Sequence, residues 1–384
     1  MNEDVNGMYN YNTLLEFIEQ NPSNDWSSSH SDRDFASAYT EVKTLLAGTV
    51  KSVETGAMIN EVRDELNRCK SEIDTIFSDN INVAKRISDV LSRDMTIFLN
   101  DHGRGHLDKV AEKAFEIIRN YSGNGEPISP YEAFILLCAI EIHDIGNIKG
   151  RSGHETKLFS IFEDKCRNVI DAVDRRAIVS IAQAHGGKTP SGNKDTISVL
   201  QNNQLNYGFI IRPRLLASIL RFADELADDF TRANRVALDL GIIGTNSEIY
   251  HKYSSSLHTV KIIKEGDNSC TINLVYDIDV DELKNQYKVF GKDKYLLDEI
   301  YDRTLKMERE RRYCIKFMHP FVYLDRIKVI INIYQNCIQM ETISYTLEDL
   351  SYPDCPVNGS INEIVGVSIF SGKEEYEKYY TERE

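Results

Sequence analysis

Apolar residues recur at three- and four-residue steps through most of the first 237 residues, which is the spacing of one buried helix face. The segments in which we expect a helix are residues 9–21, 35–50, 59–77, 82–99, 106–121, 130–144 and 214–228. Between the first two lies PSNDWSSSHSDRD, a polar stretch that cannot form a core and is typical of a linker. The pattern therefore predicts a helical bundle.

The spacing changes after about residue 237. HTVKIIKEGDNSCTINLVYDI alternates around a GDNS turn and predicts two strands. Helices are expected in DELKNQYKVF and at residues 294–314, and further strands at residues 326–336 and 361–370. We therefore expect a mainly α protein in three parts, namely a helical extension with a linker (1–80), a helical domain (81–237) and a smaller C-terminal α+β domain (238–384).

Composition narrows the class of protein. The chain has 384 residues, of which 41% are hydrophobic, so it can form real cores, yet no apolar run approaches the roughly 20 residues of a membrane helix. The acidic start MNEDVNGMYNYN lacks the profile of a signal peptide, and we expect a cytoplasmic protein that does not bind membranes. A net charge of -15 disfavours nucleic-acid binding through a general positive field and leaves small anionic substrates open.

The seven cysteines are scattered and never spaced as CxxC. Neither a zinc ribbon nor a disulfide framework is indicated, so we expect reduced, buried thiols.

Histidines are concentrated in the helical part. Five of the nine lie within 84 consecutive residues: His102, His106, His143, His154 and His185. His143 is followed by Asp144 at a helix end, which offers a neutral nitrogen and a charged oxygen to one point and suits a divalent transition metal. Asp224 lies on an apolar helix, where a carboxylate is costly to bury unless it is paired or binds a metal.

Each of these residues also has an ordinary explanation. A buried histidine often only satisfies a backbone carbonyl, Asp224 could pair with Arg221, and His102 could be an exposed turn residue. His106 is the better candidate of the first pair, because the glycines at 103 and 105 indicate that the helix begins there. Packing alone gives no reason to place the whole set at successive helix ends, so the set indicates a metal site.

The motifs GHLDKV, IHDIGN, GHE, AHGG and LRFADELAD, in this order, resemble the HD superfamily of metal-dependent phosphohydrolases, whose pattern is H…HD…D on a helical bundle. The resemblance covers about residues 80–237. It implies that His106, His143, Asp144 and Asp224 are metal ligands, with Asp144 as the bridge between two ions. It further implies that His154 and His185 match the second-metal positions.

The chain departs from the cyclic-dinucleotide branch of that superfamily, which resembles HDIGK followed by GYP, because it has Asn147 in HDIGN and no GYP. Lys149, Arg151 or Lys188 could replace the missing cation, although each is also explained as an ordinary solvated side chain. NDHGRGH and FADELADDFTRANR are also similar to a bacterial subgroup of HD proteins in conflict and defence settings. Residues 145–222 carry twelve Lys/Arg against six Asp/Glu, which favours a phosphate-bearing ligand.

We therefore expect a metal-dependent phosphohydrolase, a phosphodiesterase or nucleotidase, that cleaves a nucleotide-type phosphoester with a metal-activated hydroxide. Two divalent ions are expected, from among Mn, Fe, Ni, Co, Zn and Mg, with His143, Asp144 and Lys188 as the catalytic residues. The alternatives are a nuclease for single-stranded nucleic acid, which the acidic charge disfavours, and a nucleotide-sensing or partner-binding module. Homo-oligomerisation is left open.

Overall fold

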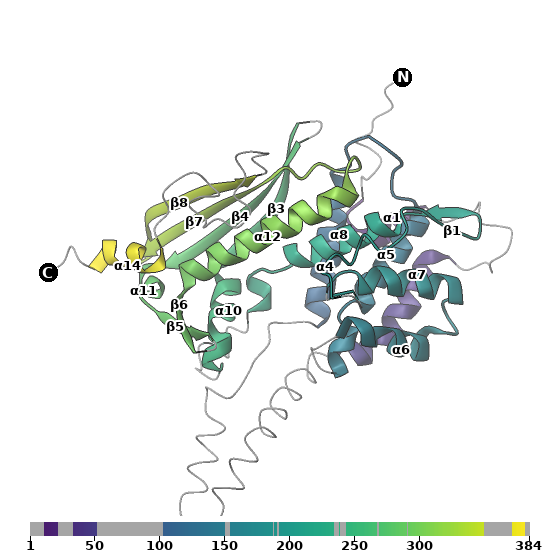
Figure 1. Cartoon of the computed structure of the whole chain (residues 1–384), viewed down its shortest axis with the longest axis horizontal. Helices are drawn as coiled ribbons and strands as arrows, with labels where there is room; N and C mark the ends of the chain where they lie inside the picture. The colour runs from purple at the N-terminus through teal and green to yellow at the C-terminus, as the bar shows by residue number, and fades with distance from the viewer. Residues whose placement is uncertain are drawn as a thin grey trace, which may run out of the picture.

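The computed structural model describes residues 11–21, 34–51, 103–149, 154–186, 188–189, 192–233, 238, 243–266, 269–289, 291–348 and 371–380. Helices dominate one half of this part and a twisted sheet dominates the other (Figure 1). The prediction of a mainly α fold is thus confirmed.

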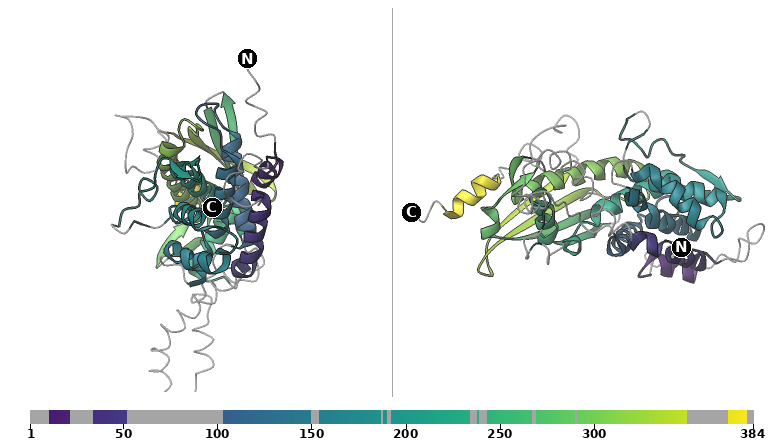
Figure 2. Two further views of the ribbon diagram at one scale, coloured as in Figure 1. Left: turned by 90° about the vertical axis from the view of Figure 1, so that its right-hand side faces the viewer. Right: turned by 90° about the horizontal axis from the view of Figure 1, so that it is seen from below.

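The helical half is assembled around one helix that is buried on every side. Its helices are α1 (Leu14–Gln20), a helix over 35–51, α4 (Arg104–Arg119), α5 (Pro130–Ile142), α6 (His154–Cys166), α7 (Ala172–Gln183) and α8 (Pro213–Leu226). α5 packs against α1, α4, α7 and α8, and its side chains are buried from Tyr131 to Ile142. Figure 2 shows the N-terminal helices along the outside of this half.

The polar groups of α5 are all at its ends. Ser129 caps the helix by accepting a hydrogen bond from the Glu132 N–H, and the Glu132 carboxylate accepts one from the Ser129 N–H. Arg212, which precedes α8, pairs with Glu132 at 2.7 Å. At the other end Arg104 of α4 pairs with Glu141 at 2.7 Å. These buried charges are therefore compensated, and they fix the ends of α5 against α4 and α8.

The second half is a four-stranded sheet in the order β3-β4-β7-β8. Its strands are β3 (Leu257–Gly266), β4 (Ser269–Asp279), β7 (Arg326–Gln335) and β8 (Ile338–Glu348). β4 and β7 are parallel and the outer pairs antiparallel, so the chain must cross over between β4 and β7. The crossover holds α11 (Val280–Leu283), β5 (Gln286–Val289), β6 (Lys292–Tyr295) and α12 (Leu296–Met318), and α12 lies along the sheet (Figure 1). α10 (Thr245–Ser256) precedes the sheet, and α14 (Gly372–Tyr380) follows it.

α12 also joins the two halves, because it packs against α8 of the helical half. Arg221 of α8 pairs with Glu310 of α12 at 2.7 Å, and Lys306 of α12 pairs with Glu225 at 2.7 Å. The last turns of α8 are therefore held between α4 on one side and α12 on another.

One expectation about local structure is wrong, and one hairpin was not expected. DELKNQYKVF is helical only as far as Leu283, after which its QYKV residues form β5 and pair with β6. The alternation of that tetrapeptide and a turn with Gly291 at a φ of +80° favour a hairpin over a helix. A second hairpin, β1 (Gln204–Asn206) and β2 (Phe209–Ile211), interrupts the helical half through a turn in which Tyr207 and Gly208 both have positive φ.

β8 was not expected from the sequence, and the strand expected at residues 361–370 lies outside the described residues. The helices expected at 59–77 and 82–99 also lie outside them. In the described part of the chain, no helix combines the length and apolar character that crossing a membrane requires. The domain boundaries at residues 80 and 237 stay predictions.

Candidate metal centre

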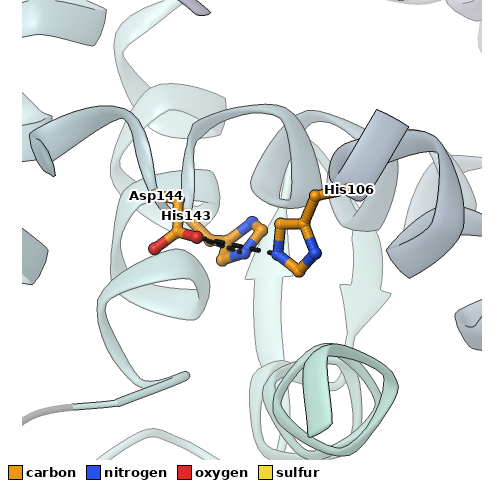
Figure 3. A group of neighbouring side chains, drawn as sticks. All are labelled: His106, His143 and Asp144. Atoms are coloured by element: carbon orange, nitrogen blue, oxygen red, sulfur yellow. Dashed lines mark ion pairs between the residues drawn. The ribbon is translucent and has the colours of Figure 1, made fainter. Parts of the chain in front are cut away.

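Four of the expected ligands converge from three helix ends. His106 lies in the first turn of α4, His143 is the C-cap of α5 with Asp144 directly after it, and Asp224 lies in the last turn of α8. His106, His143 and Asp144 are buried and each offers a ligand atom within 4.8 Å of the others (Figure 3).

The nitrogens and acid oxygens face one another. His106 Nε2 lies 3.2 Å from Asp224 Oδ1 and 3.6 Å from Asp144 Oδ2. His143 Nε2 lies 3.7 Å and 3.5 Å from the same two oxygens. Arg221, which could have paired with Asp224, instead binds Glu310. The ordinary explanation of Asp224 as half of an ion pair with Arg221 is therefore wrong.

Backbone carbonyls orient two of the imidazoles. His143 Nδ1 lies 2.8 Å from the Ile140 carbonyl oxygen, and His185 Nδ1 lies 2.6 Å from the Ala182 carbonyl oxygen. Because a carbonyl oxygen only accepts, each Nδ1 carries a hydrogen. When the imidazole is neutral, its Nε2 therefore presents a lone pair. In the described part of the structure the buried His143 Nε2 makes no hydrogen bond. A lone pair that faces two carboxylates requires a proton or a cation between them.

The pKa values show the same demand for positive charge. Burial would lower the pKa of His143, but the attraction of Asp144 and Asp224 outweighs it and raises the pKa to about 9. Burial and the nearby charge of Arg232 lower the pKa of His106 to about 4, so this imidazole is neutral at pH 7. Burial would raise the pKa of Asp224, but the two histidines beside its carboxylate bring that pKa well below its usual value.

The two oxygens of Asp144 face different groups. Oδ2 is directed to His106 and His143, whereas Oδ1 lies 4.0 Å from His185 Nε2 and accepts a hydrogen bond of 3.1 Å from Asn147 Nδ2. His185 is buried directly after α7, and its ring meets that of His143 edge to face at 4.9 Å. The two oxygens of Asp144 thus face different imidazoles, Oδ1 that of His185 and Oδ2 those of His106 and His143.

The structure describes the remaining candidates only in part. α6 begins at His154, whose side chain lies outside the described part of the structure, as do the side chains of Lys149 and Arg151 and all of His102. Lys188 is exposed, three residues after His185. The roles expected for His154 and Lys188 therefore stay predictions.

Sequence reasoning missed the contact that Asn147 makes. Asn147 stood out only as a departure from HDIGK, yet its side chain is buried and its amide donates to Asp144 Oδ1. The spacing of three residues from Asp144, which the 3-10 helix η2 (Ile145–Lys149) converts into contact, was the available signal.

The donor set fits a divalent transition metal. Two buried imidazole nitrogens and two carboxylate oxygens converge, and this mixture of nitrogen and oxygen donors suits Mn, Fe, Co, Ni or Zn. Asp224 keeps 31% of its side chain exposed while the two histidine side chains are fully buried. The centre is therefore open to solvent on the side of Asp224.

Comparison with known proteins gives one match. The model of a family described as HD-CE matches residues 95–306, more than half of the chain. The matched region holds His106, His143, Asp144, His185 and Asp224, and continues through the first strands of the sheet into α12. Neither a curated protein nor a solved structure matches significantly.

Proposed function

The chain belongs to the HD-CE family, an HD-containing family, and on this basis we propose that it is a phosphodiesterase or nucleotidase that hydrolyses a nucleotide-type phosphoester with bound divalent metal. In this proposal α4 to α8 form the HD bundle, and the ligands are those that the HD pattern implies.

One observation carries the proposal. His143 Nε2 is buried, oriented by the Ile140 carbonyl, and directed at carboxylate oxygens of Asp144 and Asp224 at 3.5 and 3.7 Å. These separations are longer than a hydrogen bond, and one metal–nitrogen bond and one metal–oxygen bond, each of about 2 Å, would together span them. A packing role alone would not require a second imidazole, His106, at the same oxygens.

The residues of the centre have two roles: some would hold the ion, and others orient its ligands. His106, His143, Asp144 and Asp224 would hold an ion, and the Ile140 carbonyl keeps the His143 lone pair directed at it. Bound divalent cations supply a Lewis acid that activates water and neutralises charge on the phosphoryl group. The exposed side of Asp224 admits the phosphate, and Lys188, exposed near His185, is proposed to contact it. No protein nucleophile is required.

We propose two ions rather than one because the two carboxylate oxygens of Asp144 face different histidines. Its Oδ2 serves the position of His106 and His143, and its Oδ1 faces His185, which would bind a second ion together with His154 from the start of α6. Asn147 limits the rotation of this carboxylate by donating to Oδ1.

The test is a screen of the full chain for phosphate or nucleotide release with Mn²⁺ and Ni²⁺. Substrates are nucleoside mono-, di- and triphosphates, cyclic mono- and dinucleotides, and short DNA and RNA. Release from nucleotides that disappears in the variant His143→Ala/Asp144→Ala, but not in His319→Ala, supports the proposal. Thermal stabilisation by nucleotides without release would favour a sensing module, and release confined to single-stranded DNA or RNA would favour a nuclease.

A further inference from the structure

Two exposed aromatic rings meet where the helical half joins the sheet. Phe230 lies in the 3-10 helix η3 (Phe230–Arg232) with 40% of its surface exposed, and His258 lies on β3 with 45% of its side chain exposed. Their centroids are 6.0 Å apart and their planes differ by 24°, so the rings form an offset stack. Asp277 Oδ2 lies 3.7 Å from His258 Nε2 and orients this ring.

η3 is fixed close to the metal centre. Asp229 caps η3 by accepting hydrogen bonds from Thr231, and its Oδ2 lies 3.2 Å from Lys109 Nζ. Lys109 follows His106 by three residues on α4 and lies on the same face, about one turn or roughly 5 Å along the axis. The segment that carries Phe230 is therefore packed against α4, the helix whose first turn supplies His106.

The segment that carries Phe230 also carries a cation. Arg232, at the end of η3, is largely buried, and its guanidinium is 3.8 Å from Asp228 Oδ1. Lys109 adds a second cation beside η3.

The exposed ligand of the centre lies near the end of α8, shortly before the same segment. Asp224 is the exposed member of the cluster, and the chain passes from it through Asp228 and Asp229 directly into η3. A ligand with one end at the metal and the other end at Phe230 would follow the segment that joins α8 to η3. Its chemistry would be anionic at the first end and flat and aromatic at the second.

Resting on the proposed function, we propose that Phe230 and His258 form a stacking platform for the nucleobase of a mononucleotide whose phosphate lies at the metal centre. Arg232 and Lys109, the two cations beside η3, offset the negative charge of Asp228 and Asp229 next to the phosphate. Stacking on aromatic rings accepts every base, because each has a π-face. The platform therefore distinguishes nucleotides from sugar phosphates and discriminates weakly between bases.

The test compares two ligands that share a phosphate and differ in the base. AMP and ribose 5-phosphate are titrated into the Mn²⁺-loaded full chain by calorimetry, and chromatography of the sample after each titration verifies that the ligand stays intact. We expect AMP to bind roughly ten- to a hundredfold more tightly. Phe230→Ala should remove most of this difference while leaving the affinity for ribose 5-phosphate unchanged. Phe159→Ala, which removes a similarly exposed ring on α6, is the matched control.

A second variant gives a direct signal from the ring. Phe230→Trp keeps the platform and adds an indole to a chain with one other tryptophan, Trp26. AMP should quench its fluorescence and ribose 5-phosphate should not, while the parent chain, which retains Trp26, should show no base-dependent quenching.

The outcomes separate this inference from the proposed function. Equal affinity for the two ligands, or a preference for AMP that survives in Phe230→Ala, overturns the platform even if phosphoesters are hydrolysed. Base-dependent binding that needs Phe230 supports the platform even if no hydrolysis is found, in which case the phosphohydrolase assignment fails alone.

Discussion

Arg104 and Glu141 form a bidentate ion pair, in which Nη1 and Nη2 of the guanidinium each lie 2.7 Å from one carboxylate oxygen. Arg104 lies two residues before His106, and Glu141 lies two residues before His143. The pair therefore joins the start of α4 to the end of α5 at the point where each presents an imidazole. Tyr39 also donates to Glu141 at 2.8 Å and connects the helix over residues 35–51 to the same junction.

Arg104→Ala should lower the free energy of unfolding by about 2 to 4 kcal/mol, because it leaves Glu141 charged and buried. Lys43→Ala, which breaks an exposed pair with Asp108, should cost less than about 1 kcal/mol. Chemical denaturation measures both. Arg104→Met/Glu141→Leu should recover much of the loss, and a double variant less stable than Arg104→Ala would contradict this account.

The metal-free protein should be most stable near pH 6.5. The pKa of His143 is raised to about 9, so its stabilising contribution is complete below its unfolded value of about 6.5 and is lost as the pH rises through 9. The lost free energy of unfolding should be on the order of 3 kcal/mol. The contribution of His106 has the opposite pH dependence. Because its pKa is lowered to about 4, the free energy of unfolding falls as the pH drops from 6.5 through 4.

Denaturation of the chelator-treated protein between pH 4 and 9.5 measures this profile. His143→Gln should flatten the alkaline limb and leave the acid limb in place. An alkaline limb that is unchanged in this variant would show that another group causes it. Metal binding at pH 7.5 should release a proton, because the ion replaces the one on His143.

His185→Ala should reduce the metal content from about two ions toward one and lower turnover at least roughly a hundredfold, because His185 faces the Asp144 oxygen that His143 does not. His154→Ala should behave alike. Elemental analysis and turnover of the loaded enzyme measure the two effects, with His319→Ala as the control. One tightly bound ion and near-normal turnover in both variants would place the protein with single-metal HD enzymes.

Asn147→Ala should weaken metal binding by about ten- to a hundredfold without removing a ligand, because it frees Asp144 Oδ1 to rotate. Competition with a chromophoric chelator gives the dissociation constant independently of activity. Asn147→Asp, which replaces the donor with a second carboxylate, should not restore the parent affinity. Parent-like affinity in Asn147→Ala would show that the contact is dispensable.

The sequence was sufficient to predict those parts of the fold in which the spacing of apolar residues and glycines alone determines the structure. The helices that carry His106, His143 and Asp224 follow from apolar periodicity and glycine position, and the order of the motifs brought them to one centre. Residues joined across the chain were not predictable in this way. Nothing local relates Arg221 to Glu310 or Lys109 to Asp229, because those pairs depend on where α12 and η3 pack.

The QYKV hairpin was missed for a related reason. Its flanking residues have the polarity of a surface helix, and only the pairing of β5 with β6 beside α10 decides between the two structures. From the sequence, Asn147 was interpreted only as the loss of the lysine in HDIGK. Its contact with Asp144 depends on the 3-10 turn that directs its side chain back to that carboxylate.

The crossover between β4 and β7 has a consequence for synthesis on the ribosome. By the time the nascent chain has emerged as far as Leu226, it contains every proposed metal ligand, but the surface of α8 that α12 covers is still bare. Arg221 and Glu225 then lack their ion-pair partners until Glu310 and Lys306 are translated, 89 and 81 residues later. A metal ion captured during that interval would crosslink α4, α5 and α8 before the sheet exists, and would act as a folding template for the translating polypeptide.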